Sequence, residues 1–344
     1  METVRVGVIG TGQIGTEHIN RLSHVVKGSR IVAVSDMKRE YSAHILDQFS
    51  DVAFYEHAED LINNENVDAV VITCFNPLHA PYTLLAVKAG KPVLCEKPLG
   101  NTAEEIREIM EAEIAGGKRL VNVGFMRRFD QGYQALKNVV RSREMGEPLI
   151  AYCAHRNVGD WVGHIPEMND ARAVVGTAIH EIDVMSWLFD EPFVSAQALM
   201  GKSTGSAAAY EGFHDPVILN LKTQSGIMVM LEVNMACQYG YDIQCQVVSE
   251  KGVAKMPEPA TVEKRFNFSN SVAISDSWKG RFRAAFDAEF QAWIDSIRTG
   301  RDMNVANTWD AYRAALMTDV CIEAEKRGHE VMCSLPECPA FYKA

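Results

Sequence analysis

The feature that most constrains the fold is a glycine-rich turn near the start of the chain. The apolar run Val4–Ile9 indicates a buried strand, and Gly10, Gly12 and Gly15 follow it directly in the spacing GxGxxG, where a helical pattern begins. In a βαβ unit the first glycine permits a tight turn, the second lets a pyrophosphate approach the backbone, and the third allows close helix–strand packing. Such glycines occur often by chance, but this context predicts a dinucleotide-binding domain.

The first 125 residues alternate short β-branched runs with helical patterns. This alternation is typical of a doubly wound α/β domain, whose parallel strands are covered on both faces. The expected strands are Val4–Ile9, 30–36, 69–73, 92–96 and 120–124, and the expected helices are 14–26, 38–49, Ala58–Asn63, 81–89 and 103–115. Thr102 and Glu105 form a capping box at the start of the last helix.

After about residue 147 longer strand-like runs are followed by helices, which predicts an α+β domain on an open antiparallel sheet. Turn sequences at 224–226 and 250–252 indicate hairpins. The expected elements are strands at 148–156, 194–200, Val217–Thr223, 227–237 and 243–249, a loop at 157–170, and helices at 174–189, 282–298 and Thr308–Arg327. We therefore predict a Rossmann domain over residues 1–125. A substrate-binding and oligomerisation domain follows over 126–344, and its C-terminal helices can pack back on the first.

Asp36 ends the second expected strand, about 20 residues after the glycine turn. A carboxylate there binds the adenosine ribose and repels a 2′-phosphate, which favours NAD over NADP. Lys38 and Arg39 favour the opposite, because a basic side chain beside the ribose can accept that phosphate. They can equally be solvated charges at a helix start. On the carboxylate we predict NAD as the cofactor.

Lys97 lies in the sequence Glu96-Lys97-Pro98, directly after an expected strand. Ligands of open α/β sheets bind outside the carboxyl ends of the strands. A lysine at that edge can hydrogen-bond a substrate hydroxyl and stabilise a developing alkoxide during hydride transfer. On spacing alone, Lys97 can equally be an ordinary surface lysine.

His180 shares one expected helical face with Asp183 and Trp187. A histidine titrates near neutrality and can take the proton that a carbinol loses as hydride leaves. The alternative is a core histidine paired with Asp183. Arg127 and Arg128 follow an expected strand, where they can bind a ligand or cover the sheet end.

Composition excludes several other classes of protein. A formal net charge of -11 disfavours nucleic-acid binding, which needs a basic surface. No apolar run approaches the roughly 20 residues that span a bilayer, and a strand starting at Val4 leaves no room for a signal peptide. The eight cysteines are scattered, as expected for reduced thiols in the cytoplasm. No HxxxH or HExxH spacing appears, so we expect no metal site.

Taken together, the motifs resemble the glucose–fructose oxidoreductase/inositol dehydrogenase family, and within it the bacterial inositol 2-dehydrogenases. The resemblance covers nearly the whole chain. It is carried by Gly10–Gly15, Asp36 and the segments 95–99, 124–128, 155–157, 180–183, 239–244, 276–278 and 308–310. It implies NAD-dependent oxidation of a ring hydroxyl of a cyclic polyol, such as myo-inositol or a related sugar, to the ketone.

The resemblance also implies roles for single residues. Lys97 would contact the nicotinamide ribose and the substrate hydroxyl, His180 would accept the proton, and Lys97-Pro98 would be a cis peptide. The polyol site would comprise Arg127, His155, Asn157, Asp183 and Tyr239. We expect cofactor contacts from Gly10, Gly12, Gln13, Ile14, Gly15, Asp36, Met37, Thr73, Asn76, His79, Glu96 and Lys97. The sheet of the second domain would form subunit interfaces in a dimer or tetramer.

One departure from the family concerns the substrate. Inositol dehydrogenases carry an aspartate four residues before the catalytic histidine, where this chain has Gly176, and the loop 158–170 also differs. Two alternatives therefore stay open. One is a dehydrogenase of the same fold that acts on an aldose or a glycoside, and the other is a non-catalytic regulator that binds NAD or a sugar.

Overall fold

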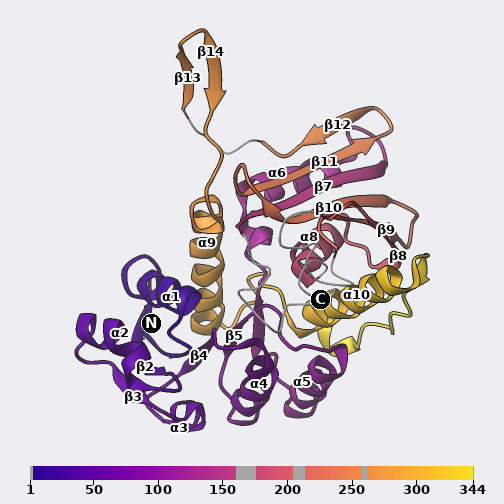
Figure 1. Cartoon of the computed structure of the whole chain (residues 1–344). Coiled ribbons are helices and arrows are strands. Elements are labelled where there is room, and N and C mark those ends of the chain that lie inside the picture. Colours follow the sequence, from indigo (N-terminus) through magenta and orange to yellow (C-terminus); the bar gives the residue numbers. More distant parts are fainter. Residues whose placement is uncertain (1–2, 160–175, 204–213, 258–261, 344) are drawn as a thin grey trace. The chain divides into compact units, whose positions relative to one another are not determined.

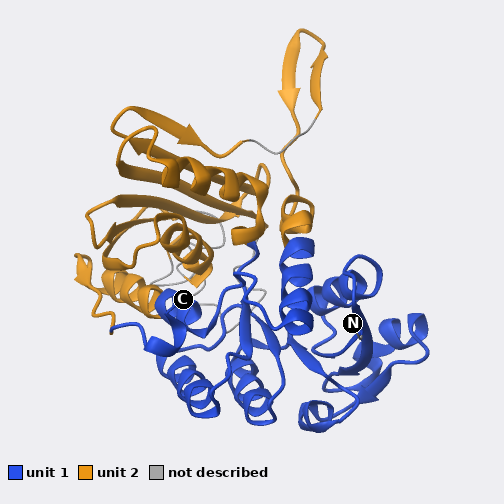
Figure 2. Cartoon of the chain, turned by 180° about the vertical axis from the view of Figure 1, so that it is seen from behind, with its two compact units in different colours: residues 1–126, 286–315, 337–344 blue, residues 127–285, 316–336 orange. Residues whose placement is uncertain are grey.

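The computed structural model describes residues 3–159, 176–203, 214–257 and 262–343. The chain forms two compact units, coloured separately in Figure 2. Unit 1 comprises residues 1–126, 286–315 and 337–344, and unit 2 comprises residues 127–285 and 316–336. The first segment of unit 1 ends beside the expected boundary at residue 125, and two later segments also belong to this unit.

Unit 1 contains a six-stranded parallel sheet in the order β3-β2-β1-β4-β5-β6. The strands are β1 (Val4–Ile9), β2 (Ser29–Ser35), β3 (Ala53–Tyr55), β4 (Ala69–Ile72), β5 (Val93–Glu96) and β6 (Val121–Gly124). The doubly wound prediction is confirmed. Strand β3 was not predicted, because it has only three residues and no buried apolar run. The strand order reverses between β1 and β4, the switch point beside which such sheets bind ligands.

The helices of unit 1 follow the strands as the alternation predicts (Figure 1). They are α1 (Gln13–His24), α2 (Ala43–Gln48), α3 (Ala58–Asn63), α4 (His79–Lys88) and α5 (Ala103–Gly116). The expected helix 38–49 instead begins as a 3₁₀ turn, η1 (Arg39–Ser42). The capping interaction at α5 is confirmed, since the Thr102 side chain accepts a hydrogen bond from the Glu105 amide at 3.2 Å.

Unit 2 contains a seven-stranded sheet in the order β12-β11-β7-β10-β9-β8-β15. The strands are β7 (Pro148–Val158), β8 (Phe193–Met200), β9 (Val217–Thr223), β10 (Met228–Cys237), β11 (Asp242–Ser249), β12 (Gly252–Lys255) and β15 (Val331–Met332). Both predicted hairpins are present, at β9–β10 and β11–β12. The sheet is not wholly antiparallel, because the interior strand β7 pairs with β10 in parallel and with β11 antiparallel.

Three helical segments of unit 2 carry buried charged side chains. They are η3 (Met126–Phe129), α6 (Gln131–Ser142) and α8 (Ile179–Phe189), the last preceded by the turn η5 (Gly176–Ala178). The expected helix 174–189 thus corresponds to η5 and α8, and residues 174–175 and most of the expected loop 157–170 lie outside the described residues. Helix α6 was not predicted, although Asp130 caps it by accepting from the Gly132 and Tyr133 amides.

Three further elements complete the chain. The strands β13 (Glu263–Phe266) and β14 (Ser269–Val272) form a separate hairpin, which Figure 1 shows apart from the larger sheet. The long helices α9 (Trp278–Thr299) and α10 (Thr308–Arg327) were both predicted. Each of them contributes residues to both units.

Candidate functional site

The glycine turn of unit 1 has the geometry that a pyrophosphate requires. Gly10 has a φ of +93°, which favours glycine. A Cβ atom at Gly15 would lie 2.0 Å from the Gly10 carbonyl oxygen, whereas a Cβ at Gly12 would meet no atom of the described residues within 4 Å. Among those residues, no side chain caps the N-terminus of α1 at Gly12. The turn therefore offers open space and uncapped helix N–H groups to an anion.

Asp36 follows β2 and is held by three donors. Its Oδ2 accepts from the Thr11 amide at 2.8 Å and from the Thr11 hydroxyl at 2.7 Å, and its Oδ1 accepts from the Met37 amide at 2.8 Å. Thr11 is buried, and its hydroxyl also lies 3.0 Å from Ser42 Oγ. Asp36 is therefore fixed beside the glycine turn, where a carboxylate can receive ribose hydroxyls.

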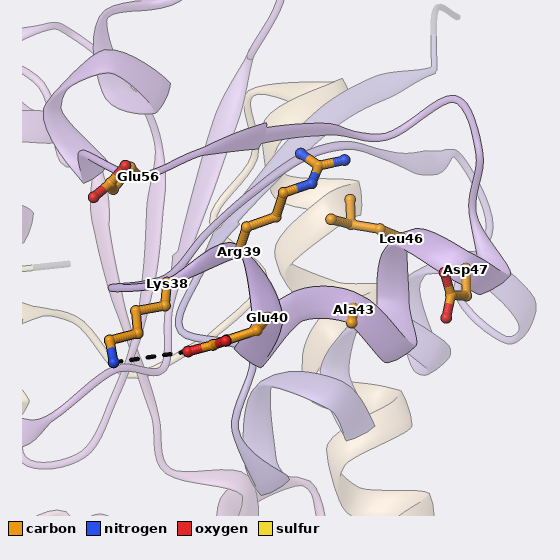
Figure 3. A pocket seen from close by; sticks show the side chains of 7 residues that line it. All are labelled: Lys38, Arg39, Glu40, Ala43, Leu46, Asp47 and Glu56. Carbon is orange, nitrogen blue, oxygen red and sulfur yellow. Dashed lines mark ion pairs between the residues drawn. The ribbon is translucent and has the colours of Figure 1, made fainter.

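A surface cavity of about 600 Å³ is lined by residues of the segment after Asp36 and by one residue following β3 (Figure 3). Its lining residues are Lys38, Arg39, Glu40, Ala43, Leu46, Asp47 and Glu56. Lys38 Nζ lies 3.7 Å from Glu40, and the Arg39 guanidinium lies 5.4 Å from the centre of the Phe54 ring. Both side chains are exposed and these contacts are weak, as expected for solvated charges at a helix start.

Glu96, at the end of β5, links Lys97 to a buried histidine. Its Oε1 lies 2.8 Å from His18 Nε2, and its Oε2 accepts from the Lys97 amide at 3.2 Å. Burial raises the pKa of Glu96, but the His18 hydrogen bond and nearby positive groups outweigh it and bring that pKa below its usual value. Burial lowers the pKa of His18, which favours the neutral imidazole.

His79 and Thr73, two residues expected to contact the cofactor, form hydrogen bonds with backbone carbonyl groups. His79 Nδ1 lies 2.7 Å from the Pro98 carbonyl oxygen and its Nε2 lies 2.9 Å from that of Cys74. The Thr73 hydroxyl lies 3.0 Å from the Ile9 carbonyl oxygen and 2.7 Å from the Gly10 carbonyl oxygen. The His79 contact holds the Pro98 carbonyl, directly after the Lys97–Pro98 bond, which is cis as the resemblance implied. Contacts of these residues with the cofactor stay predictions.

In unit 2 the structure brings Arg127, His155 and Glu181 together. Arg127 and Glu181 form a buried ion pair, and His155 Nδ1 lies 2.9 Å from Glu181 Oε2. The ring of His180 lies 6.3 Å from that of His155, between ring centres. An imidazole pair with a carboxylate and a guanidinium can bind hydroxyl groups and move a proton.

Asp183 has a partner that the sequence analysis did not consider. Its two carboxylate oxygens accept from Arg128 Nε at 2.9 Å and from Arg128 NH2 at 2.5 Å. Both side chains are buried, so this is a bidentate ion pair in the interior of unit 2. Trp187 is half-buried and every other residue of α8 is buried, so the face that carries His180 and Asp183 lies in the interior of unit 2.

The Tyr239 hydroxyl contacts a side chain that points to the opposite face of the sheet from His155. The Tyr239 hydroxyl donates to Asp242 Oδ2 at 2.5 Å and accepts from Arg156 NH1 at 3.1 Å. Arg156 and His155 are consecutive in β7, so their side chains point to opposite faces. Asn157, two residues beyond His155 in β7, is half-buried. The roles of Tyr239 and Asn157 in substrate binding stay predictions.

Two residues that contact this cluster were missed in the sequence. Glu181 was not predicted, although a carboxylate next to the candidate base His180 in the sequence indicates a candidate site residue. Tyr241 is buried, its ring centre lies 6.1 Å from that of His155, and burial raises the pKa of its hydroxyl. Alternation along β11 would have revealed it, because Ile243 and Cys245 also face inward.

Similarity to known proteins places these two units in a family. A sequence profile described as "Oxidoreductase family, NAD-binding Rossmann fold" matches residues 4–125. A second, described as "Oxidoreductase family, C-terminal alpha/beta domain", matches residues 137–333. Together they cover most of both units, so the fold and its glycine turn define a dinucleotide-dependent oxidoreductase.

Individual relatives extend over the whole chain. An inositol 2-dehydrogenase of Serratia proteamaculans and another of Azotobacter vinelandii are each 45% identical over 341 residues, covering 99% of this chain and of each relative. A crystal structure of a myo-inositol dehydrogenase from Lactobacillus casei, in complex with NAD(H) and myo-inositol, aligns with a TM-score of 0.93 at 32% identity. That alignment covers 99% of this chain and 100% of the other. The chain therefore belongs to the glucose–fructose oxidoreductase/inositol dehydrogenase family and is an NAD-dependent dehydrogenase.

Two further observations concern membranes and metal ions. Within the described ranges, no helix is both long and apolar enough to cross a membrane. Among those same residues, no three His, Cys, Asp or Glu side chains are grouped to hold a metal ion.

Proposed function

We propose that this dehydrogenase oxidises one ring hydroxyl of a cyclic polyol, myo-inositol or a related inositol, to the ketone. The observation that carries the proposal is 45% identity to inositol 2-dehydrogenases over 99% of both chains. The likeness to a myo-inositol dehydrogenase structure at 32% identity supports it. The alternative of a non-catalytic regulator loses its support, because the chain is an enzyme of this family.

The residues of unit 1 fit the cofactor. The open glycine turn would hold the pyrophosphate, and Asp36 would receive the adenosine ribose hydroxyls. NAD, when bound, supplies the acceptor for the hydride that leaves the ring carbon.

The proton of the reacting hydroxyl is assigned to His180. As the ring carbon loses hydride, its oxygen loses a proton, and a neutral imidazole is the usual acceptor near neutral pH. Lys97 would hydrogen-bond that oxygen and stabilise its developing negative charge. Arg127, His155, Asn157, Asp183 and Tyr239 are the proposed contacts to the other hydroxyls of the ring.

Gly176 occupies the position at which a carboxylate partner of His180 is expected. The resemblance predicts an aspartate at this position, and Asp183 could have replaced it as the carboxylate partner. Both Asp183 oxygens accept hydrogen bonds from Arg128, and each keeps a second lone pair for another donor. If Asp183 is the partner of His180, Asp183→Asn is the damaging substitution and Gly176→Asp changes little. We expect Gly176→Asp to raise turnover of myo-inositol and to raise the pKa of His180 in the pH profile of kcat/KM.

Single substitutions test the catalytic pair. Lys97→Ala and His180→Ala should each lower kcat about 10²–10⁴-fold. Affinity for NAD, measured by fluorescence titration, should stay near wild type in His180→Ala. Lys88→Ala, an exposed lysine in the last turn of α4, is the matched control and should keep full activity. Wild-type turnover in His180→Ala would place the proton acceptor elsewhere.

A substrate panel tests the class of polyol. NAD reduction should be measured at pH 8 with myo-inositol, scyllo-inositol, glucose and a methyl glucoside. We expect the highest kcat/KM with an inositol. A higher value with glucose or the glucoside would favour the aldose or glycoside alternative.

We also propose that the chain forms a homo-oligomer through the sheet of unit 2. One face of this sheet exposes large apolar side chains from five neighbouring strands, an arrangement typical of protein interfaces. They are Tyr152, Leu199, Ile218, Met230 and Met332. Met230→Lys should lower the assembly mass in light scattering, while an unchanged mass would exclude this face.

All eight cysteines are free thiols, which supports a reducing compartment such as the cytoplasm.

A further inference from the structure

A continuous set of polar contacts lies beneath Glu96 inside unit 1. Arg21 of α1 donates from Nε to Asp287 Oδ1 of α9 at 2.7 Å, and its NH1 lies 2.6 Å from His18 Nδ1. His18 Nε2 lies 2.8 Å from Glu96 Oε1. His18 is fully buried and Arg21 is 6% exposed, so the contacts run through the interior.

The direction of these hydrogen bonds is determined by Arg21. A guanidinium has only donors and stays protonated, so His18 Nδ1 must accept. The remaining ring nitrogen of the neutral imidazole, Nε2, therefore carries the hydrogen and donates it to Glu96. This fixes one tautomer of His18 and directs its N–H at the carboxylate.

Aromatic side chains enclose the network. The Phe290 ring centre lies 4.3 Å from that of His18, and the Phe286 ring centre lies 5.5 Å from it. The Arg21 guanidinium lies 5.0 Å from Phe286 and 5.6 Å from Phe290. These rings shield the polar groups from water, which strengthens each hydrogen bond.

The network leads to the backbone of Lys97. Burying charged and polar groups is rarely the most stable solution, because well-packed apolar side chains of similar volume often do as well or better. Here the remaining oxygen of the buried carboxylate, Glu96 Oε2, accepts from the Lys97 amide at 3.2 Å. Besides His18, the charged or titratable groups that act on Glu96 are Lys97 and His79. Those acting on His18 are Glu96, Arg21 and Glu17.

We propose that His18 is a positioning residue for the reaction. Through Glu96 it fixes the backbone at Lys97 and keeps a carboxylate charge next to the lysine that handles the substrate hydroxyl. This inference rests on the role proposed for Lys97 above.

The test compares two substitutions at His18. Leu at this position fills the space but removes the donor to Glu96, whereas Gln keeps both an N–H donor for Glu96 and an oxygen that can accept from Arg21. His18→Leu should lower kcat at least tenfold while KM for NAD changes less than threefold, because small displacements of a catalytic group are costly. His18→Gln should recover most of the loss.

The pH profile separates positioning from simple stability. Without the His18 donor the pKa of Glu96 rises, so the acid limb of the kcat profile should move to higher pH in His18→Leu. Phe290→Leu is the control, since it loosens the packing against His18 but leaves the donor in place. It should lower Tm without moving the acid limb. An equal shift in both variants, or none in His18→Leu, would overturn the inference.

A second variant covers the case in which His18→Leu does not fold. Glu96→Gln keeps the shape of the side chain and removes its charge, and it should lower kcat by a similar factor while the acid limb no longer depends on this group. Wild-type kcat in Glu96→Gln, with an inactive Lys97→Ala, would overturn the inference and leave the role of Lys97 intact. Wild-type turnover in Lys97→Ala would overturn that role and this inference with it.

Discussion

The Thr11 hydroxyl should contribute measurably to cofactor affinity. Thr11→Val replaces it with a methyl group and removes the 2.7 Å hydrogen bond to Asp36, while the two backbone donors to this carboxylate remain. A hydrogen bond to a charged group contributes about 1.5–3 kcal/mol. Since Asp36 is half-buried and water can replace part of the interaction, we take the lower value. Because this hydrogen bond is already present in the free enzyme, the value is an upper bound on the loss of binding energy and corresponds to at most about a tenfold weaker Kd for NAD.

The assay is a fluorescence or calorimetric titration of NAD and of NADP against the parent enzyme, Thr11→Val and Thr11→Ser. Serine keeps the hydroxyl and loses only a methyl group, so its Kd for NAD should stay within about twofold of the parent. The Kd for NADP should change less than that for NAD, because Asp36 opposes a 2′-phosphate in every variant. Equal affinities for NAD in the valine and serine variants would refute the role assigned to this hydroxyl.

Three further predictions concern other contacts. Gly15→Ala should destabilise unit 1, because its Cβ would lie 2.0 Å from a carbonyl oxygen. Gly12→Ala should fold normally and weaken NAD binding. Measurements of Tm and titration with NAD distinguish the two variants. Asp183→Asn removes the carboxylate charge from the buried pair with Arg128 and should lower the free energy of unfolding by about 3 kcal/mol, measured by urea denaturation. Hydrogen bonds from an arginine lower the pKa of Asp68 in the folded protein. The ionised carboxylate therefore stabilises the fold fully above the pKa that Asp68 has in the unfolded chain, and this stabilisation is lost as pH falls through its pKa in the folded protein. The Tm difference between Asp68→Asn and the parent should therefore be largest near pH 7 and shrink below about pH 4.

The sequence predicted those parts of the fold that depend on local patterns. The apolar strands of unit 1 and the glycine turn carry their signal within a few residues, and both were found. Strand β3 was not predicted because Ala53 is exposed and the strand is too short to show an alternation of apolar and polar residues. Helix α6 had a signal that was overlooked, since Tyr133, Leu136 and Val140 are buried at helical spacing behind the Asp130 cap.

The candidate site was predicted less completely, because its contacts join distant segments. The pairing of Arg128 with Asp183 spans 55 positions, and nothing local to either residue indicates it. For the same reason the sequence did not show that Glu96 contacts His18, which lies 78 positions earlier. Residue types at strand ends identify candidates for chemistry, but only the folded chain shows which charges neutralise one another.

The discontinuous composition of unit 1 affects how the protein is made. Phe286 and Phe290, which cover His18 and Arg21, lie about 160 residues beyond the first segment of this unit. During synthesis the first 126 residues therefore leave the ribosome before their own covering side chains exist, and the side of α1 that carries His18 and Arg21 stays open to water while residues 127–285 are added. A nascent chain that stops before residue 290 would expose this surface to chaperones and proteases. Construction of the nucleotide-binding unit thus ends only when translation is nearly complete.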